Sequence, residues 1–446
     1  MVGVGLFAFL ATMVAVPVAI IGAFVRWVRS KSGADKSWSS ASSTVGGENT
    51  FSLGDQGSPG EVRRRMDQIR QMDPDFSLTI LEDFLAALYT EAHTARGFNA
   101  VDRYSAYLRP GARASLRRLP HAALSTIIVG ALRPVAFSRD DRARLFRIVY
   151  EIEANYTETP AGGSPQSYYA LDRFTLVRAF GARSRPPSKA RALVCPNCGA
   201  PLEKTVQGRC TYCGQAVDSG QFDWVVESIE LGNRETRGPM LTGTTEEIGT
   251  TSPTVFDRGL SAQMEALRRA DPAFQTDVVD KRVHTIFSTM QSAWSTLDWK
   301  RARPCLTDRL WNAQTYWIEA YRQQGLRNIT ENARIQKLEF VRADVDKWYL
   351  TITVRIAASG LDYTLNTANN QVVGGSRNKE RPYTEYWTLV RSAQKPAADG
   401  TVLCQHCGAP CNVQMAERCG HCGALMEAST FDWVLSRIEQ DEVYGG

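Results

Sequence analysis

The chain has 446 residues, of which 43% are hydrophobic and 22% are charged. This length allows two or three domains, and this composition is that of a globular protein, which excludes an intrinsically disordered chain. The formal net charge of +5 is modest for the length, so charge alone does not indicate a nucleic-acid-binding protein.

An apolar segment opens the chain. The first 25 residues carry no charged side chain. A helix over 2–25, rising about 1.5 Å per residue, would span the roughly 30 Å hydrocarbon layer of a membrane. Pro17 interrupts the segment, which transmembrane helices tolerate. Residues 1–29 are therefore predicted to form a single transmembrane anchor.

Basic residues after this segment predict its orientation. Arg26, Arg29, Lys31 and Lys36 follow the apolar run and should stay on the cytoplasmic side. We therefore expect a single-pass protein of the inner membrane, with its N-terminus outside and its later domains in the cytoplasm. The alternative is a cleaved signal peptide, which would place positive charge before the apolar run and a small-residue cleavage site after it.

Two linkers divide the rest of the chain. Residues 30–60, rich in Ser and Gly, predict a flexible tether, and residues 232–260, with repeated Gly, Thr and Pro, predict an interdomain linker. The segments 61–231 and 261–446 repeat each other at three points. The matching pairs are Asp73-Pro-Asp-Phe76 with Asp271-Pro-Ala-Phe274, Cys195-x2-Cys198 with Cys404-x2-Cys407, and Phe222-Asp-Trp-Val225 with Phe431-Asp-Trp-Val434. The sequence therefore predicts two tandem copies of one domain.

The spacing between the matching motifs predicts an insertion in the second copy. The first pair is 198 residues apart and the other two are 209 apart, which implies about a dozen net inserted residues. The run 361–381, with its clusters of Asn, Gly and Ser, is expected to hold them as a long hairpin loop.

Each copy begins with a helical pattern and continues with strands. Apolar residues recur every three or four positions over 76–88 and 278–294, which predicts one amphipathic helix in each copy. The preceding Asp-Pro pairs are expected to start these helices, with Asp as the cap and Pro in the first turn. Alternation over 348–356 predicts a strand with one buried face, and 147–154 and 174–180 are interpreted as further strands. Helices followed by an antiparallel sheet predict an α+β fold.

Eight of the ten cysteines form two identical patterns. In each pattern, eleven residues separate two Cys-x2-Cys pairs, which are Cys195, Cys198, Cys210 and Cys213 in the first copy and Cys404, Cys407, Cys419 and Cys422 in the second. Tetrahedral zinc takes four thiolates at about 2.3 Å, and a tight turn can direct both sulfurs of a pair at one ion. The glycine after each pair can supply the positive φ of that turn. We therefore predict two structural Zn²⁺ ions in ribbons at 193–216 and 402–425.

Other interpretations of the cysteines remain open. Disulfides conflict with a cytoplasmic location. A redox dithiol needs only one Cys-x-x-Cys pair, and iron in a rubredoxin-like site is the remaining option. Cys305 and Cys411 align with apolar positions of the first copy, so they are predicted to be small buried side chains. His406 and His421 flank the predicted ligands and are expected to be turn residues.

Together these features resemble a known family. Each copy combines an Asp-Pro-x-Phe opening, an amphipathic helix, an antiparallel sheet and a final Phe-Asp-Trp-Val strand. This order is similar to the domain shared by the translocase of the inner membrane, subunit 44, and its bacterial relatives. The resemblance covers roughly 61–231 and 261–441, and the inserted ribbons depart from the mitochondrial form.

The resemblance implies a fold and a class of function. It implies two tandem cone-shaped α+β domains of the nuclear transport factor 2-like superfamily. In the family this domain lies against the inner membrane, binds proteins and anionic lipids, and has no catalytic residues to carry over. We therefore expect a non-catalytic scaffold that binds a protein partner, anionic lipid or both, with a link to membrane protein transport or assembly.

An enzyme is the alternative class. The sequence contains no phosphate-binding Gly-rich loop ending in Lys-Ser/Thr, no His-Glu-x-x-His and no Gly-x-Ser-x-Gly. A pocket inside the cone could still use Tyr169 or Tyr386, although both fit aromatic residues packed in a sheet.

One region is rich in arginine. Ten arginines and three aspartates lie between Asp102 and Arg147. Seven arginines are candidates for contact with anionic lipid headgroups, because each basic residue near such a surface contributes about 1 kcal/mol. They are Arg113, Arg117, Arg118, Arg139, Arg142, Arg144 and Arg147. A solvated surface is the alternative, and nucleic acid is not expected as a partner because the charge does not lie on the cysteine turns.

Overall fold

The computed structural model describes residues 59–190, 192–236, 241, 250–393, 402–403, 409–411, 432–441 and 444–445. The predicted anchor at 1–29, nearly all of the tether and the four cysteines of the second ribbon lie outside these residues. Within the described residues, no helix is both long enough and apolar enough to cross a membrane. The anchor therefore stays a prediction.

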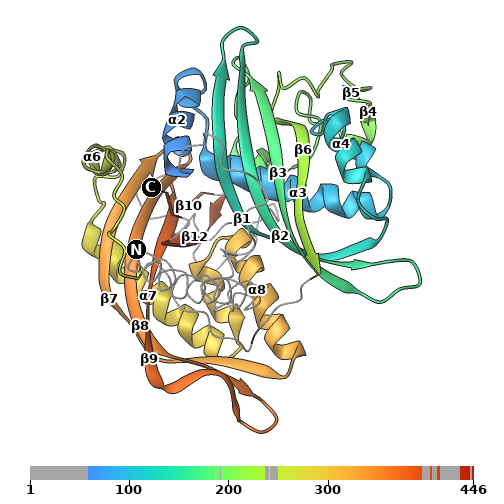
Figure 1. The fold of residues 1–446 in the computed structure, drawn as a ribbon. Coiled ribbons are helices and arrows are strands. Elements are labelled where there is room, and N and C mark those ends of the chain that lie inside the picture. Colours follow the sequence, from blue (N-terminus) through green and yellow to red (C-terminus); the bar gives the residue numbers. More distant parts are fainter. Residues whose placement is uncertain are drawn as a thin grey trace, which may run out of the picture.

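Both halves of the described chain have the same order of principal elements (Figure 1). Two helices, a 3₁₀ helix and a third helix precede three long strands, and a last strand follows an inserted segment. In the first half these are α2 (Pro59–Met72), α3 (Leu78–Gly97), η2 (Val101–Tyr104), α4 (Pro110–Arg117), β1 (Ala123–Asp140), β2 (Leu145–Thr159), β3 (Gln166–Ala179) and β6 (Val225–Thr236). In the second half they are α6 (Leu260–Ala270), α7 (Thr276–Ser295), η4 (Trp299–Cys305), α8 (Asp308–Gln323), β7 (Leu326–Val345), β8 (Tyr349–Asn366), β9 (Val372–Ser392) and β12 (Val434–Gln440).

Short elements occupy the inserted segments. In the first half they are α5 (Pro187–Ala190), η3 (Leu202–Lys204), β4 (Thr205–Val206) and β5 (Arg209–Cys210), and in the second half β10 (Val402–Leu403) and β11 (Pro410–Cys411). β4 pairs with β5 and β10 with β11, each as a two-stranded antiparallel sheet.

Each half contains one curved antiparallel sheet of four strands around a long helix (Figure 1). The strand order is β1-β2-β3-β6 in the first sheet and β7-β8-β9-β12 in the second. The apolar side of α3 packs on the first sheet, where Leu88 meets the inward residues of β2 and β3, and α7 packs on the second sheet through Phe287 and Met290. The predicted helices and strands are therefore confirmed, as is the mixed α+β class.

The first strands of the two sheets are irregular at equivalent positions. Pairing of β1 with β2 shifts register after Ser125, Val129 and Pro134, and pairing of β7 with β8 shifts after Glu331, Ile335 and Phe340. Each shift in β7 falls 206 residues after its counterpart in β1. The positive-φ residues Thr126 and Asn332 have the same separation. Bulges bend a strand locally, so both strands bend at the same three places.

The Asp-Pro motifs do not start the long helices, so that prediction is wrong. Asp73 follows the end of α2, where its amide donates to the carbonyl of Ile69 at 2.8 Å, and Asp271 ends α6 in the same way. The cap of α3 is Ser77, whose Oγ accepts from the amide of Ile80 at 3.4 Å. The carboxylates are drawn away from the helix starts because each binds an arginine of the sheet.

In the first half this arginine joins two of the repeated motifs. Arg178 of β3 lies 2.9 Å from the Asp73 carboxylate, and both side chains are fully buried. Its guanidinium lies over the rings of Phe76 and Trp224, at 5.7 and 4.9 Å from their centroids. The Asp-Pro-x-Phe and Phe-Asp-Trp-Val motifs therefore meet around one buried cation.

The second half repeats this arrangement in a more exposed form. Arg391 of β9 pairs with Asp271 and lies 4.9 Å from the centroid of Trp433, which also contacts Phe274. About a quarter of the Arg391 side chain is exposed, unlike Arg178.

Two features of the second sheet differ from expectation. The run 361–381 is not a loop, because β8 continues to Asn366 and β9 begins at Val372. It also holds only some of the extra residues, since the separation between the halves has already grown from 198 to 206 at β1 and β7. Both faces of β8 are buried rather than one. Arg355 on its outer face binds Thr254 and Asp441, at 2.9 Å each, so the linker and the C-terminal end cover that face.

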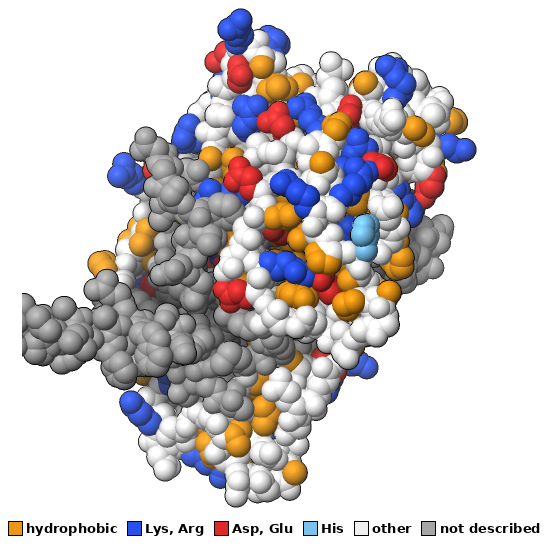
Figure 2. Space-filling view, turned by 45° about the vertical axis from the view of Figure 1, so that its right-hand side comes forward, with side chains coloured by type: hydrophobic (Ala, Val, Ile, Leu, Met, Phe, Trp, Pro, Cys, Tyr) orange, Lys and Arg blue, Asp and Glu red, His pale blue; other side chains and the backbone are white. Residues whose placement is uncertain are grey.

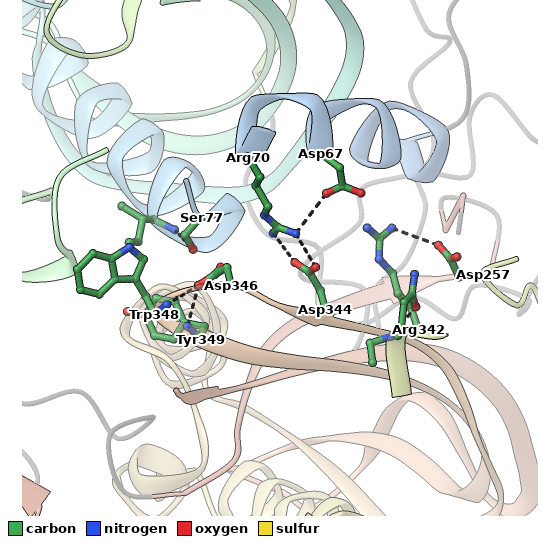
Figure 3. Close-up of polar contacts among 12 residues, drawn as sticks. Asp67, Arg70, Ser77, Asp257, Arg342, Asp344, Asp346, Trp348 and Tyr349 are labelled. Atoms are coloured by element: carbon green, nitrogen blue, oxygen red, sulfur yellow. Dashed lines mark hydrogen bonds and ion pairs between the residues drawn. The ribbon is translucent and has the colours of Figure 1, made fainter. Parts of the chain in front are cut away.

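Ion pairs, some buried and some partly buried, join the two halves. Arg70 of α2 binds both carboxylate oxygens of Asp344 in β7, at 2.7 and 2.6 Å (Figure 3). Burial alone would raise the pKa of Asp344, but Arg70 outweighs burial and holds the pKa below its usual value. Nearby, the Trp348 indole donates to the carbonyl of Asp75 at 2.9 Å.

A second set of ion pairs lies closer to the centre of this interface. Arg63 of α2 binds Glu439 of β12 at 3.1 Å. Glu82 of α3, which is 1% exposed, accepts from Arg309 of α8 at 3.4 Å and from Arg437 of β12 at 2.9 Å. The halves are therefore held together by ion pairs that are largely shielded from water.

Candidate metal centre

The first cysteine ribbon lies between β3 and β6 and is built from two matching turns. In each turn the amide of the glycine donates back to the carbonyl of the first cysteine: Gly199 to Cys195 at 2.9 Å and Gly214 to Cys210 at 2.8 Å. Both glycines have positive φ, at 77° and 72°, as the sequence predicts. Each turn therefore places its two cysteines on the same side of the loop.

The four sulfurs converge on one point. Cys195, Cys198, Cys210 and Cys213 offer ligand atoms that all lie within 4.8 Å of one another. Cys195 Sγ and Cys213 Sγ are 4.0 Å apart, and Cys198 Sγ and Cys210 Sγ are 3.9 Å apart. A tetrahedral ion with metal–sulfur bonds of about 2.3 Å separates its sulfurs by roughly 3.8 Å, whereas a disulfide needs about 2.05 Å. The residues therefore fit a four-thiolate metal ion, and all four cysteines are free thiols.

Polar groups around the sulfurs act on their protonation. Hydrogen bonds from the Asn197 side chain and the Gln215 amide lower the pKa of Cys213 to about 6. Burial raises the pKa of Cys195 to about 12. A metal ion binds thiolates, so it would favour deprotonation at every one of these sulfurs.

The ribbon is anchored in the core of the first half. Cys195 and Cys210 are buried among the core residues, together with Leu202. The Tyr107 hydroxyl donates to the carbonyl of Val194 at 2.6 Å, and Arg109 donates to the carbonyl of Asp218 at 3.2 Å. Four protein thiolates leave no open position for water, which is typical of a structural metal rather than a catalytic one.

The remaining predicted cysteines are only partly described. Cys404, Cys407, Cys419 and Cys422 lie outside the described residues, so the second metal site stays a prediction. Cys411 lies in β11, and its side chain is not among those described. Cys305 is buried as predicted, and burial raises the pKa of its thiol.

Three of the candidate lipid-binding arginines belong to α4 or its C-terminal end. Arg113 is buried and donates to Asp102 at 3.0 Å, so it is not part of an exposed basic surface. Arg117 is exposed but pairs with the same aspartate, and Arg118 donates to Ser115 Oγ at 2.7 Å.

The other four arginines belong to the β1–β2 hairpin. Arg139 and Arg144 lie over the ring of Phe180, at 5.1 and 5.8 Å from its centroid, and Arg147 pairs with Glu227 at 3.1 Å. Arg142 is exposed at the turn. Figure 2 shows basic side chains interleaved with acidic and apolar ones, not gathered into one continuous basic patch on this face.

The sequence did not single out a buried polar cluster inside the first half. The Tyr89 hydroxyl donates to Asp172 Oδ2 at 2.9 Å, and His93 Nε2 lies 4.0 Å from the same oxygen. Arg96 donates to His93 Nδ1 at 3.1 Å and to Glu158 at 2.6 Å. Burial raises the pKa of Asp172 to about 6, and burial and Arg96 lower that of His93. In the sequence, the cluster could have been found from Asp172, a carboxylate at an inward-facing position of a strand.

The residues of this cluster and the two candidate tyrosines are buried by the side chains packed around them. Tyr89 and His93 are fully buried, and Asp172 is 4% exposed. Tyr169 and Tyr386 are also buried, and Tyr386 stacks on Tyr444 with ring centroids 3.7 Å apart. None of these five side chains faces open space where a substrate could sit.

The fold and the site define a mixed α+β protein with curved antiparallel sheets and one described four-cysteine site of metal-binding geometry. Residues 260–401 match the Tim44-like domain family, which confirms the predicted resemblance for this part of the chain. The match extends from α6 through β9. No curated protein matches the chain.

Among solved structures, the chain is similar to an "Ntf2 like protein involved in plasmid conjugation". The two are 8% identical with a TM-score of 0.17, and the alignment covers 79% of this chain and 96% of that one.

Proposed function

We propose that this protein is a non-catalytic scaffold, anchored in the inner membrane, whose two Tim44-like domains bind a protein partner at the cytoplasmic face. The family match over residues 260–401 carries the proposal, because domains of this family lie against the inner membrane and bind proteins and anionic lipids. The role would therefore be linked to membrane protein transport or assembly.

The first half is proposed to be a second copy of the same cone-shaped domain. Support comes from the three register shifts of β1 and β7, each displaced by 206 residues. It also comes from the paired arginines Arg178 and Arg391, which occupy the same place between an aspartate and a tryptophan. The boundaries 61–231 and 261–446 follow from this proposal.

Both ribbons are proposed to hold structural Zn²⁺. Support comes from the sulfur separations in the first ribbon and the identical spacing in the second. Zinc is favoured because its closed four-thiolate sites are typical of such paired turns. Anionic lipid is proposed as an additional ligand of the exposed arginines at the β1–β2 hairpin, with Arg142 at its turn.

An enzyme is less well supported. The Asp172 cluster has the raised carboxyl pKa that active sites often show. However, its members are buried and already bonded to one another, so it offers no place for a substrate.

Photo-crosslinking of the full chain in membranes tests the proposal. A photoreactive residue is placed at exposed positions of both halves, such as Phe98 and Val278. We expect reproducible crosslinks to one or a few membrane-associated proteins, and we expect a chain lacking residues 1–29 to lose them. The absence of any crosslinked protein at positions on both halves would contradict the scaffold role.

A further inference from the structure

One sheet edge of the first half lacks a backbone partner. β1 is an edge strand, and none of the described residues forms a backbone hydrogen bond with the outer edge of 123–129. The edge strands β6 and β12 are each bridged by a neighbouring segment, at Leu108 and Leu306. Within the part of the chain that the structure describes, β7 receives a single such bond, from the amide of Asp257 to the carbonyl of Val341 at 2.9 Å, beyond the part that corresponds to 123–129.

This edge of β1 also lacks the charged residues found at the equivalent edge of β7. No residue from 123 to 132 is charged, whereas the equivalent stretch of β7, 329–338, contains Glu331, Arg334 and Lys337. Charged side chains on an edge strand oppose pairing with another chain. Register shifts also oppose pairing of an edge strand with another chain, but β1 and β7 have them at matching positions. The two edges therefore differ in their charged residues.

A groove runs along this edge. It has a volume of about 440 Å³ and is lined by three consecutive residues of β1, Ile127, Ile128 and Val129. These residues lie at the register shifts after Ser125 and Val129, where regular alternation of side chains is interrupted, so the groove lies beside the irregular part of β1. The opposite wall contains Ala87 of α3, Ala313 of α8 and Leu202 of the ribbon. It also contains Glu91, Arg103 and Arg309, each of which already has a partner of opposite charge or a hydrogen-bond donor. The small alanines leave room for side chains beside the open backbone.

We propose that this groove binds an extended, uncharged peptide segment of a partner protein, which adds to β1 as a fifth strand. The amides and carbonyls of 123–129 that face away from β2 recognise an extended backbone, and alternate side chains of the added strand enter the groove. The inference rests on the proposed scaffold function, because it describes how that scaffold holds its partner. Both halves and the ribbon contribute to the groove, so the site exists only in the assembled chain.

The experiment measures binding of a defined peptide to the full chain in detergent. The probe is a fluorescent eight-residue peptide of alternating valine and threonine, compared with the same peptide carrying N-methyl groups on its four central amides. We expect the methylated peptide to bind at least tenfold more weakly, because it keeps the side chains but loses the backbone hydrogen bonds. Hydrogen exchange should show protection of residues 123–129 by the unmodified peptide only.

A double substitution tests the edge itself. Ser125→Glu with Ile128→Arg places in β1 the residues that β7 has at its matching bulge, Glu331 and Arg334, so the fold should tolerate them. We expect at least a tenfold loss of peptide affinity. Ala161→Arg with Ser164→Glu makes the same charge changes in the exposed β2–β3 turn and should leave the affinity unchanged.

Three results would overturn the proposal. They are no binding of the unmodified peptide at millimolar concentration, binding that neither methylation nor the edge substitution weakens, and a dimer that the edge substitution converts to monomers. The last would assign the edge to a second copy of this chain. Crosslinked partners that remain after the edge substitution would leave the scaffold function intact while removing this site from it.

Discussion

At the scale of single residues, the two matching aspartates should differ in their effect on stability. Asp73 and Arg178 are both fully buried, so Asp73→Asn leaves a buried guanidinium without its counter-charge and should lower the free energy of unfolding by about 3–5 kcal/mol. Asp271→Asn breaks the partly exposed counterpart and should cost about 1 kcal/mol or less. Urea denaturation of both variants measures the difference, and equal losses would contradict it.

The metal centre gives a prediction about composition. The intact chain should bind two zinc ions, and Cys198→Ser should reduce the content to one by removing a ligand of the first site. Cys305→Ser is the matched control, because Cys305 lies apart from both predicted ribbons. Elemental analysis per chain and titration of free thiols measure both quantities. Metal-free protein with paired thiols would refute the prediction.

Asp172 predicts a pH dependence of stability. Its pKa in the folded chain is about 6, above the value of about 4 for an unfolded aspartate. The folded state therefore binds the proton more tightly, so this group stabilises the fold as pH falls from about 7 towards 4. The difference in unfolding free energy between the wild type and Asp172→Asn should shift in favour of the wild type over this range. A difference that does not change with pH would count against a raised pKa.

At the scale of elements, the long β8–β9 hairpin depends on one glycine. Gly375 has a φ of 70°, and a Cβ there would lie 2.2 Å from the carbonyl oxygen of Asp362. Gly375→Ala should cost about 1 kcal/mol for the left-handed backbone and about 1–3 kcal/mol more for the clash. Gly162→Ala has a similar φ of 71° but open space around it, so it isolates the backbone cost. Thermal denaturation of the two variants separates these costs.

Elements defined by local patterns could be predicted from the sequence. The apolar spacing before Leu88 and Met290 corresponds to α3 and α7, and the Cys-x2-Cys turns have the expected glycine geometry. The Asp-Pro cap was wrong because Asp73 is held by Arg178, which is 105 residues later in the chain and gives no local signal. The hairpin was taken for a loop because its Asn and Gly residues are typical of turns, yet most of them lie within paired strands.

At the scale of the whole molecule, Glu82 links the two halves. It is the shared acceptor of Arg309 and Arg437, whose side chains are each 17% exposed. In Glu82→Gln these arginines keep Asp83 and Glu439 as partners. The substitution should therefore weaken the interface by about 1.5–3 kcal/mol. We expect an increased radius of gyration in X-ray scattering and separate unfolding transitions of the two halves. Glu319→Gln removes an exposed ion pair of α8 and should change neither measurement.

The candidate site was more predictable than the interface. Four of its ligands follow from spacing alone, because a metal imposes its geometry on nearby residues. Arg63 and Arg70 gave no such signal, since arginines on a polar helix are ordinarily exposed. Their partners Glu439 and Asp344 lie in the other half of the chain, and only the packing of the two halves brings these charges together.

The first described helix has a consequence for how the protein can be divided. α2 buries Val62, Met66 and Ile69 in the core of its own half while its arginines reach across to the other. A shortened chain that begins after Met72 would expose part of one hydrophobic core. It would also leave the carboxylates of Glu439 and Asp344 in the other half without their arginine partners. The two halves therefore depend on each other, and neither is expected to express well alone.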